Sequence, residues 1–245
     1  MTVEREPRGR YTVRLADGTP LVTGAEPAFE AGDEVFSLSA VPETRLSMDA
    51  GRGVEEATVR ADFSGGLRMW WTLRELATHG AKKHGEPSIL EVSLELENCG
   101  DRVMDVRRVW PLRAELAETR PAGPQERCYW LNTGGGSWGA KTLEPLADRA
   151  EAPLVSAVAG VDQVGAVCGF TSAYRFRGFV VWSRETADAR ISVAARHELA
   201  GDYSARSGLG VADPVAGQVS GAARPHPGVL DPGARLRCET LLVGT

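Results

Sequence analysis

Residues 88–116 read SILEVSLELENCGDRVMDVRRVWPLRAEL, and this stretch decides the fold class. Its first half alternates apolar and polar side chains one by one, with leucine or valine at positions 90, 92, 94 and 96. A period of two is typical of a β-strand with one buried face. Asn98-Cys99-Gly100-Asp101 follows and predicts a tight turn, because Asn and Gly tolerate positive φ and Asp bonds to nearby backbone. The alternation resumes from Met104 to Leu116, so the stretch predicts a long hairpin of a large antiparallel β-sandwich.

The rest of the chain repeats strand-length alternation with polar turns between the strands, and helix signals are nearly absent. Further strands are predicted at residues 10–16, 20–23, 34–40, 54–63, 66–76, 127–131, 153–159, 163–170, 174–182, 189–197 and 235–243. Regular strands with polar turns favour a sandwich or barrel over βαβ units. We therefore predict an all-β fold with few or no helices, in which residues 1–245 form one oversized β-sandwich domain. Two irregular excursions are expected within it, near residues 117–152 and 202–232.

The composition narrows the classes of partner. The chain has 33 acidic and 28 basic residues, for a net charge of -5, whereas nucleic-acid binding needs a concentrated basic surface. We expect no nucleic-acid partner. No apolar run is long enough to span a bilayer, and the charged N-terminal segment lacks the apolar region of a signal peptide. The sequence thus predicts a cytoplasmic protein with no membrane partner.

The four cysteines, at positions 99, 128, 168 and 238, are far apart in the sequence. Their spacing matches neither a metal-ligand set nor a redox motif. We predict four free thiols, no metal site and no cofactor.

The order of segments resembles a known enzyme domain. LEVSLELENCGDRVMDVRRVWPL at 90–112 is followed by a Gly- and Trp-rich loop at 128–139, then by GAVCGFTSAYRFRGFVVW at 165–182 and LRCETLLVGT at 236–245. Across roughly residues 35–245 this resembles the N-terminal β-supersandwich domain of melibiase-type α-galactosidases, glycoside hydrolase family 36 and its relatives. The resemblance implies a galactose-mutarotase-like supersandwich.

The resemblance also implies a function. In that family the two catalytic aspartates lie on a (β/α)8 barrel that follows the β-domain, and a barrel needs about 250 residues. This chain alone is therefore expected to be non-catalytic. Its implied role is that of an accessory domain that shapes the sugar entrance or the subunit interface. The implied partners are a galactoside-like carbohydrate, a catalytic barrel in the same or a companion chain, and further copies of this chain.

Candidate sugar- or domain-contact residues lie in the Gly- and Trp-rich loop. In the family this loop commonly reads like N-G-Y/W-Q-S-W-S. This chain keeps Asn132, Ser137 and Trp138 but lacks the aromatic residue and the Gln. Trp faces stack on the CH-rich faces of sugars, and Asn and Ser supply directional hydrogen bonds, so Trp130 joins the candidates. The alternative is a loop that Trp138 anchors to the core.

Two strand residues are further candidates. Trp70 lies on the polar side of its strand, where it could serve as a sugar platform or a subunit contact, unless the sheet is covered and Trp70 is core. Arg108 interrupts the apolar alternation of its strand. An isolated buried charge is very costly, so Arg108 either lines a cleft or forms a structural salt bridge.

His197 and Glu198 suggest a different class of function. Aldose epimerases, also large β-sandwiches, use a His acid and a carboxylate base. The sequence therefore leaves three hypotheses open: an accessory domain of a glycoside hydrolase, a free-standing carbohydrate-binding protein that uses Trp138 and Trp70, and an epimerase- or lyase-like enzyme that uses His197.

Overall fold

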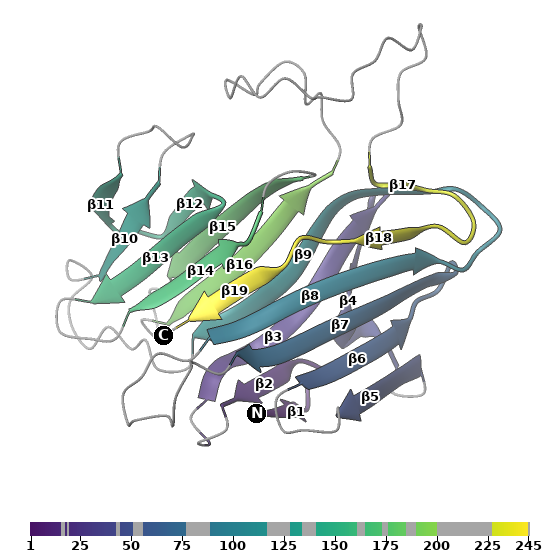
Figure 1. The fold of residues 1–245 in the computed structure, drawn as a ribbon, viewed down its shortest axis with the longest axis horizontal. Helices are drawn as coiled ribbons and strands as arrows, with labels where there is room; N and C mark the ends of the chain where they lie inside the picture. Colours follow the sequence, from purple (N-terminus) through teal and green to yellow (C-terminus); the bar gives the residue numbers. More distant parts are fainter. Residues whose placement is uncertain are drawn as a thin grey trace, which may run out of the picture.

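The structure of the chain is a computed structural model. It describes residues 1–15, 18, 20–42, 45–50, 56–76, 89–116, 128–133, 141–160, 165–172, 176–184, 190–199 and 227–244. These residues form nineteen β-strands, and the one complete helical element among them is the 3-10 turn η1 at Leu38–Ala40. The all-β prediction is confirmed: the strands build two large antiparallel sheets that form a sandwich (Figure 1).

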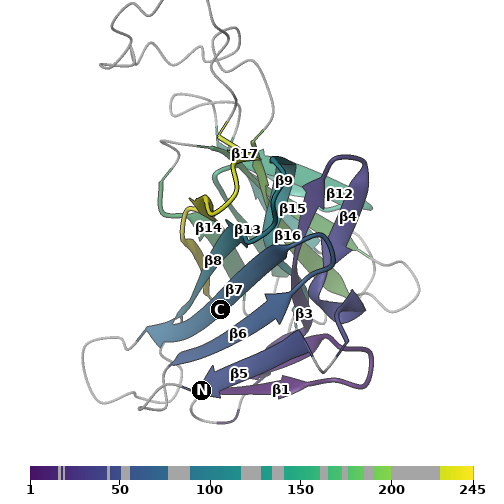
Figure 2. The ribbon, with the colours of Figure 1, turned by 90° about the vertical axis from the view of Figure 1, so that its right-hand side faces the viewer.

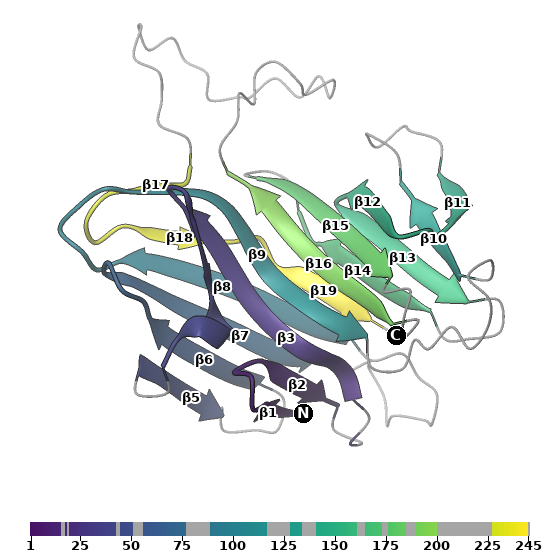
Figure 3. The same ribbon diagram turned by 180° about the vertical axis from the view of Figure 1, so that it is seen from behind.

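We call the first sheet the β9 sheet, and its strand order is β1-β2-β3-β9-β16-β15-β12, with β4 paired to β3 and β17 to β9 (Figure 3). Its strands are β1 Thr2–Arg5, β2 Tyr11–Arg14, β3 Pro20–Ala31, β4 Glu34–Ser37, β9 Met104–Leu116, β12 Arg149–Pro153, β15 Arg177–Arg184, β16 Ile191–Glu198 and β17 Val229–Leu230.

We call the second sheet the β8 sheet, and its strand order is β11-β10-β13-β14-β19-β8-β7-β6-β5, with β18 paired to β8. Its strands are β5 Leu46–Ala50, β6 Glu56–Asp62, β7 Leu67–Leu76, β8 Ile89–Asn98, β10 Cys128–Asn132, β11 Thr142–Pro145, β13 Val155–Gly160, β14 Ala166–Phe170, β18 Arg235–Arg237 and β19 Leu241–Gly244. The edge strands β1 and β5 of the two sheets lie at the same end of the sandwich (Figure 2).

The predicted hairpin between β8 and β9 is wrong. The two strands alternate as expected, but β8 pairs with β7, β18 and β19, whereas β9 pairs with β3, β16 and β17. The connection between them therefore crosses from one sheet to the other. A one-sided apolar pattern is the same whether two strands lie side by side or face each other across a core, so the pattern alone does not distinguish the two arrangements.

The inner faces of the two sheets share one apolar core, which includes Met69, Trp71 and Leu94 of the β8 sheet and Val109 and Leu112 of the β9 sheet. Trp71 is fully buried, and its indole Nε1–H donates a 2.9 Å hydrogen bond across the core to the backbone carbonyl of Pro111. A buried indole N–H needs such a partner. The bond also fixes the position of β7 relative to β9.

Leu154 carries the chain from one sheet to the other a second time. It lies between β12 of the β9 sheet and β13 of the β8 sheet, and its φ of 63° is the only positive φ among the described residues other than glycine. Its N–H donates to the carbonyl of Gly178, and its own carbonyl accepts from the N–H of Phe170. One residue thus bonds to both sheets at this corner.

The predicted excursions are partly strand. Within 117–152 the structure has β10, β11 and the start of β12, although only the first of these is predicted from the sequence. Residues 146–148 separate the short strands β11 and β12. Pro145, the last residue of β11, and Asp148 interrupt the alternation on which the prediction depends. Most of the second excursion lies outside the described residues, and its last part contains β17.

Candidate functional site

The candidate loop is described only at its two ends. Residues 134–140 lie outside the described part, and they include Ser137 and Trp138. Trp130 is 7% exposed and belongs to the core, where its strand neighbour Val158 is also buried. Its indole face is therefore covered by protein. Asn132 is partly exposed at the end of β10.

Asn132 belongs to a small polar cluster at the edge of the β8 sheet. Its side-chain amide donates a 2.9 Å hydrogen bond to Oε1 of Glu144, and the Thr142 hydroxyl donates a second bond of 2.8 Å to the same oxygen. These two bonds, the Asn132 bond first, lower the pKa of Glu144. Next to them, the Thr133 hydroxyl is bonded to backbone carbonyls of Pro153 and Val155. The polar side chains at the β10–β11 edge are therefore hydrogen-bonded to groups of this protein.

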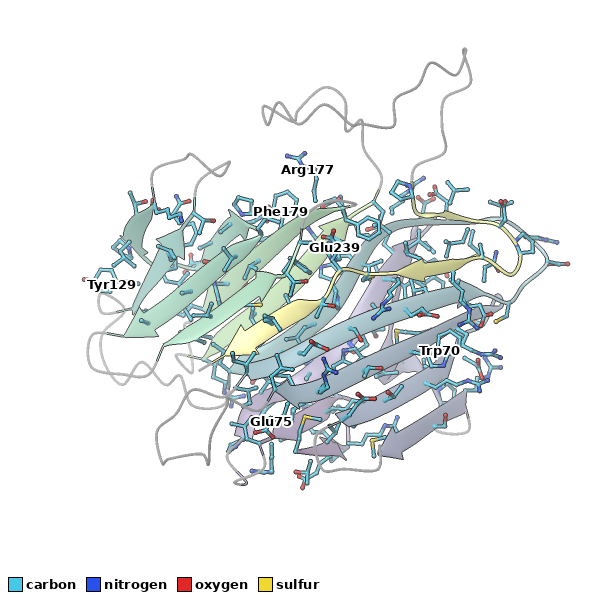
Figure 4. The ribbon with its side chains drawn as sticks, in the orientation of Figure 1. Trp70, Glu75, Tyr129, Arg177, Phe179 and Glu239 are labelled. Carbon is cyan, nitrogen blue, oxygen red and sulfur yellow. The ribbon has the colours of Figure 1, made fainter. Side chains whose placement is uncertain are left out.

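Trp70 lies outward and partly exposed on β7, as its position in the strand predicts (Figure 4). Two guanidinium groups lie near its ring: the Cζ atoms of Arg68 and Arg235 are 5.8 and 5.0 Å from the ring centroid. Arg235 comes from β18, and it also donates to Glu95 and Glu97 on β8. Trp70 is therefore at the centre of a polar surface built from three strands.

His197 and Glu198 do not share a site. His197 is 0% exposed and packs against the rings of Phe170 and Phe176, at 4.1 and 5.3 Å between centroids. Glu198 follows it on β16 and points to the opposite face, where it pairs with Arg108 and Arg196. Because neighbouring strand residues face opposite ways, the histidine lies in the core while the carboxylate lies on the outer surface.

Arg108 is not on the apolar face of β9. The pairing of β9 with β3 shifts register between Glu30 and Ala31, so Arg107 and Arg108 are both exposed and Val109 is buried. Arg108 bonds Oε2 of Glu198 at 3.1 Å and Oε2 of Glu30 at 3.2 Å. The hydrogen bond to Glu198 is the main cause that raises the pKa of Arg108. Of the two alternatives for Arg108, lining a cleft or forming a salt bridge, the structure shows the salt bridge.

A chain of ion pairs crosses the outer face of the β9 sheet, and sequence reasoning missed it. It runs Glu30–Arg108–Glu198–Arg196–Glu151–Arg149. Phe179 on β15 lies next to this chain, with the Cζ atoms of Arg196 and Arg177 at 5.1 and 5.7 Å from its ring centroid (Figure 4). These residues come from strands far apart in the sequence, so no local pattern indicates them.

The outer face of the β8 sheet divides into a charged half and an apolar half. On β6, β7 and β8 most outward positions carry Arg, Glu or Asp. The other outward residues are Thr58, Thr72, Ser93 and Trp70, with Leu76 and Ile89 paired at the strand ends. On β11, β10, β13, β14 and β19 no outward residue is charged, and Leu143, Val155 and Val167 are exposed to 72%, 41% and 50%. The outward residues of this apolar half are Tyr129, Leu131, Leu143, Pro145, Val155, Ala157, Ala159, Val167, Gly169, Leu242 and Gly244.

The apolar half was also missed from the sequence. Its signal is that β10, β13, β14 and β19 carry no charged residue on either face, unlike β7 and β8. Gly169 flattens this surface, because a Cβ there would lie 2.7 Å from Cγ2 of Val155. Val155 therefore lies across β14 and fills the space that a side chain would take.

The remaining candidate features of the described residues are a pocket, a metal site and a membrane-spanning helix. A hollow of about 350 Å³ is lined by Arg5, Glu6, Pro7, Val41 and Pro42, none of which is a predicted site residue. No group of three or more His, Cys, Asp or Glu side chains in the described ranges is arranged to hold a metal ion. Within the same ranges, no helix has the length and apolarity needed to cross a bilayer. No family model and no curated protein matches this chain.

Proposed function

We propose that this chain is a non-catalytic accessory domain of a carbohydrate-active enzyme, and that it binds a catalytic domain through the apolar half of its β8 sheet. The role is like that of the β-domain in melibiase-type α-galactosidases, which the order of its segments resembles. The observation that carries the proposal is the uncharged outer surface of β11, β10, β13, β14 and β19. A contiguous exposed apolar patch on a water-soluble protein marks an interaction surface.

The division of the β8 sheet supports this interpretation. The same sheet has charged outward rows on β6, β7 and β8, so its composition changes where β8 meets β19. At that boundary Glu91 of β8 stands next to Leu242 of β19. The charged half has the composition of a surface in contact with water. The apolar half has the composition of an interface core, from which charged residues are depleted. Figure 4 shows the two halves through Trp70 and Tyr129, which lie over opposite ends of the sheet.

The size of the apolar half favours a domain that is held beside it. Its strands have four to six residues each. At about 4.8 Å between strands and about 3.4 Å per residue, five such strands cover roughly 400 Å². A contact there buries roughly 800 Å² in total, which suits contacts between domains of one polypeptide, at about 600–1,500 Å², better than the 1,200–2,000 Å² of stable separate complexes.

The described residues also favour binding over catalysis. The one histidine in the described strands, His197, lies in the core, and Glu198 is engaged by two arginines. The buried carboxylate of Glu26 is bonded to Arg10 and to the hydroxyl of Ser39. A general acid–base pair needs two groups that converge on one reacting position, and these side chains do not converge.

A reducing compartment, and hence a cytoplasmic location, is part of the proposal. Cys128, Cys168 and Cys238 are buried as free thiols, and Cys99 is free and exposed. Disulfides are rare where thiols are kept reduced, so the four free cysteines agree with the location predicted from the sequence.

The test begins with the gene. The reading frame that encodes this chain and its neighbouring frames should encode a (β/α)8 glycosidase domain. Because a contact of this size is weak between separate chains, that domain is immobilised at high density, and it should then retain the wild-type chain. The double variant Leu143→Lys, Val167→Lys should be retained at least about tenfold less, because two charges would be buried at the contact. Both substituted side chains are exposed, so the variant should melt like the wild type.

The matched control is Ser93→Lys, which adds a charge to the outer face of β8 in the charged half. It should be retained like the wild type. The proposal is overturned by the absence of any glycosidase domain in these frames. It is equally overturned if the double variant is retained as well as the wild type.

A further inference from the structure

The charged half of the β8 sheet places side chains of three kinds in an ordered array around Trp70. The register of β6, β7 and β8 aligns them in rows across the strands. One row holds the hydroxyls of Thr58, Thr72 and Ser93; the middle row holds Arg60, Trp70 and Glu95; the third holds Asp62, Arg68 and Glu97, to which β18 adds Arg235. An indole therefore lies with hydroxyls on one side and charged groups on the other.

The charges of this array cancel. Arg68 pairs with Asp62 at 2.6 Å and with Glu97 at 3.6 Å. Arg235 pairs with Glu95 at 3.0 Å and with Glu97 at 3.2 Å. Every carboxylate around the indole is thus neutralised by a guanidinium. A charged ligand would gain little net attraction here, because each charge it meets is next to its opposite.

The same groups are well suited to hydroxyls. Guanidinium N–H groups only donate hydrogen bonds and carboxylates only accept them, while Thr and Ser hydroxyls do both. Neighbouring sugar hydroxyls need donors and acceptors close together, and the alternation of Arg with Glu or Asp supplies both. The two rows that border Trp70 therefore offer matched partners on either side of one aromatic ring.

The indole itself supplies the apolar contact. Trp70 is partly exposed, and the guanidinium carbons near it are 5.0 and 5.8 Å from its centroid. Both guanidinium groups lie over the ring within the roughly 6 Å of a cation–π contact, so a sugar that stacks on the indole displaces the more exposed of the two, Arg235. Arg235 is 57% exposed, so its side chain has room to move away from the ring.

We propose that the surface of Trp70, Arg68, Arg235, Glu95 and Glu97 binds an uncharged pyranoside chain, with a sugar ring stacked on the indole and its hydroxyls bonded to the flanking Arg–Glu pairs. The CH face of a pyranose matches an aromatic face, and its equatorial hydroxyls match the surrounding donors and acceptors. This site lies on the charged half of the sheet, away from the apolar half, and stands independently of the docking proposal.

The experiment titrates the whole chain with β-1,4-galactotriose, cellotriose and trigalacturonic acid, by calorimetry or ligand-observed NMR. At least one of the two neutral trisaccharides should bind the wild type, and more tightly than the charged one. Trp70→Ala should weaken that binding at least about tenfold. If Trp70→Ala does not fold, Trp70→Leu takes its place, since it keeps an apolar side chain but lacks a flat ring; the same loss is expected.

The matched control is Phe179→Ala. Phe179 is an aromatic residue flanked by two arginines on the outer face of the other sheet, so it tests whether loss of an aromatic–arginine contact alone changes binding. It should bind like the wild type. The proposal is overturned if neither neutral sugar binds the wild type, if the Trp70 variant binds as well as the wild type, or if trigalacturonic acid binds more tightly than both neutral sugars.

Discussion

The side-chain amide of Asn98 donates a 2.8 Å hydrogen bond to the backbone carbonyl of Leu230, 132 residues later in the chain. The same amide donates to the carbonyl of Arg102 at 2.7 Å, and its Oδ1 accepts from the N–H of Gly100 at 3.0 Å. Asn98 is 0% exposed at the end of β8. One buried side chain therefore holds both the β8–β9 crossing and the segment that returns through β17.

Asn98→Ala should lower the free energy of unfolding by about 2–4 kcal/mol, because it leaves the Leu230 carbonyl of a buried bond and two groups of partly buried bonds without this partner. Urea unfolding of the purified variant measures this loss. The control is Asn132→Ala, which removes a hydrogen bond to the partly exposed Glu144 and should cost less than about 1 kcal/mol. Equal losses in the two variants would contradict the role given to Asn98.

The sequence predicts the faces of the strands well and their partners poorly. The alternation of β7 and β8 is a local property, and the structure buries the predicted side of each, with Trp71 inward and Trp70 outward. The pairing of β8 and β9 depends instead on contacts between distant segments, such as Asn98 with Leu230. The alternation of apolar and polar residues within one strand does not specify which strand lies beside it, and the predicted hairpin is wrong for this reason.

Irregularities of register limit the prediction of the candidate site in the same way. The exposure of Arg108 follows from an irregularity in the pairing of β9 with β3, because an extra residue in one strand changes the face on which the next residues lie. The ion pairs of Arg108 join residues 78 and 90 positions away. By contrast, His197 follows the simple parity of Ile191, Val193 and Ala195 and is buried with them.

Leu154 should tolerate glycine better than a leucine in an ordinary strand. Its φ of 63° is unfavourable for a residue with a Cβ, by about 1–2 kcal/mol, and glycine adopts it freely. We expect Leu154→Gly to leave the melting temperature unchanged or to raise it. The control is Leu131→Gly on β10, a leucine of similar burial without a positive φ, which should lower the melting temperature. A lower melting temperature for Leu154→Gly than for Leu131→Gly would contradict the relief of strain.

The cysteines should differ sharply in reactivity. Cys99 is exposed, whereas Cys128, Cys168 and Cys238 are buried, and burial raises the pKa of the Cys128 and Cys168 thiols. An aromatic disulfide reagent at about pH 8 should label one thiol of the native chain and four after unfolding. Desolvation by the groups around it, and then a hydrogen bond to Glu97, also raise the pKa of the Cys99 thiol, so its labelling should be slower than that of the amino acid cysteine in solution. Cys99→Ser should abolish the native-state reaction, and rapid labelling of two or more native thiols would contradict the burial.

The ionised Asp62 side chain should stabilise the fold near neutral pH, and this contribution should be lost in acid. The hydrogen bond from Arg68, 2.6 Å long, is the main cause that lowers the pKa of Asp62 from its ordinary 3.8, and Arg60 adds to it. A carboxyl with a lower pKa in the folded state stabilises the fold above its unfolded pKa. That contribution is lost as the pH falls through the folded pKa.

Asp62→Asn should therefore be less stable than the wild type near neutral pH, and the difference in the free energy of unfolding should shrink as the pH falls through the folded-state pKa of Asp62. The difference near neutral pH should be below about 1 kcal/mol, since the side chain is 44% exposed and water screens the pair. Urea unfolding across this pH range measures it. Asp33→Asn, whose carboxylate is 100% exposed, should match the wild type throughout. The difference in the free energy of unfolding between Asp62→Asn and the wild type could instead persist or widen toward low pH. That result would show that the pair with Arg68 does not stabilise the fold through its charge.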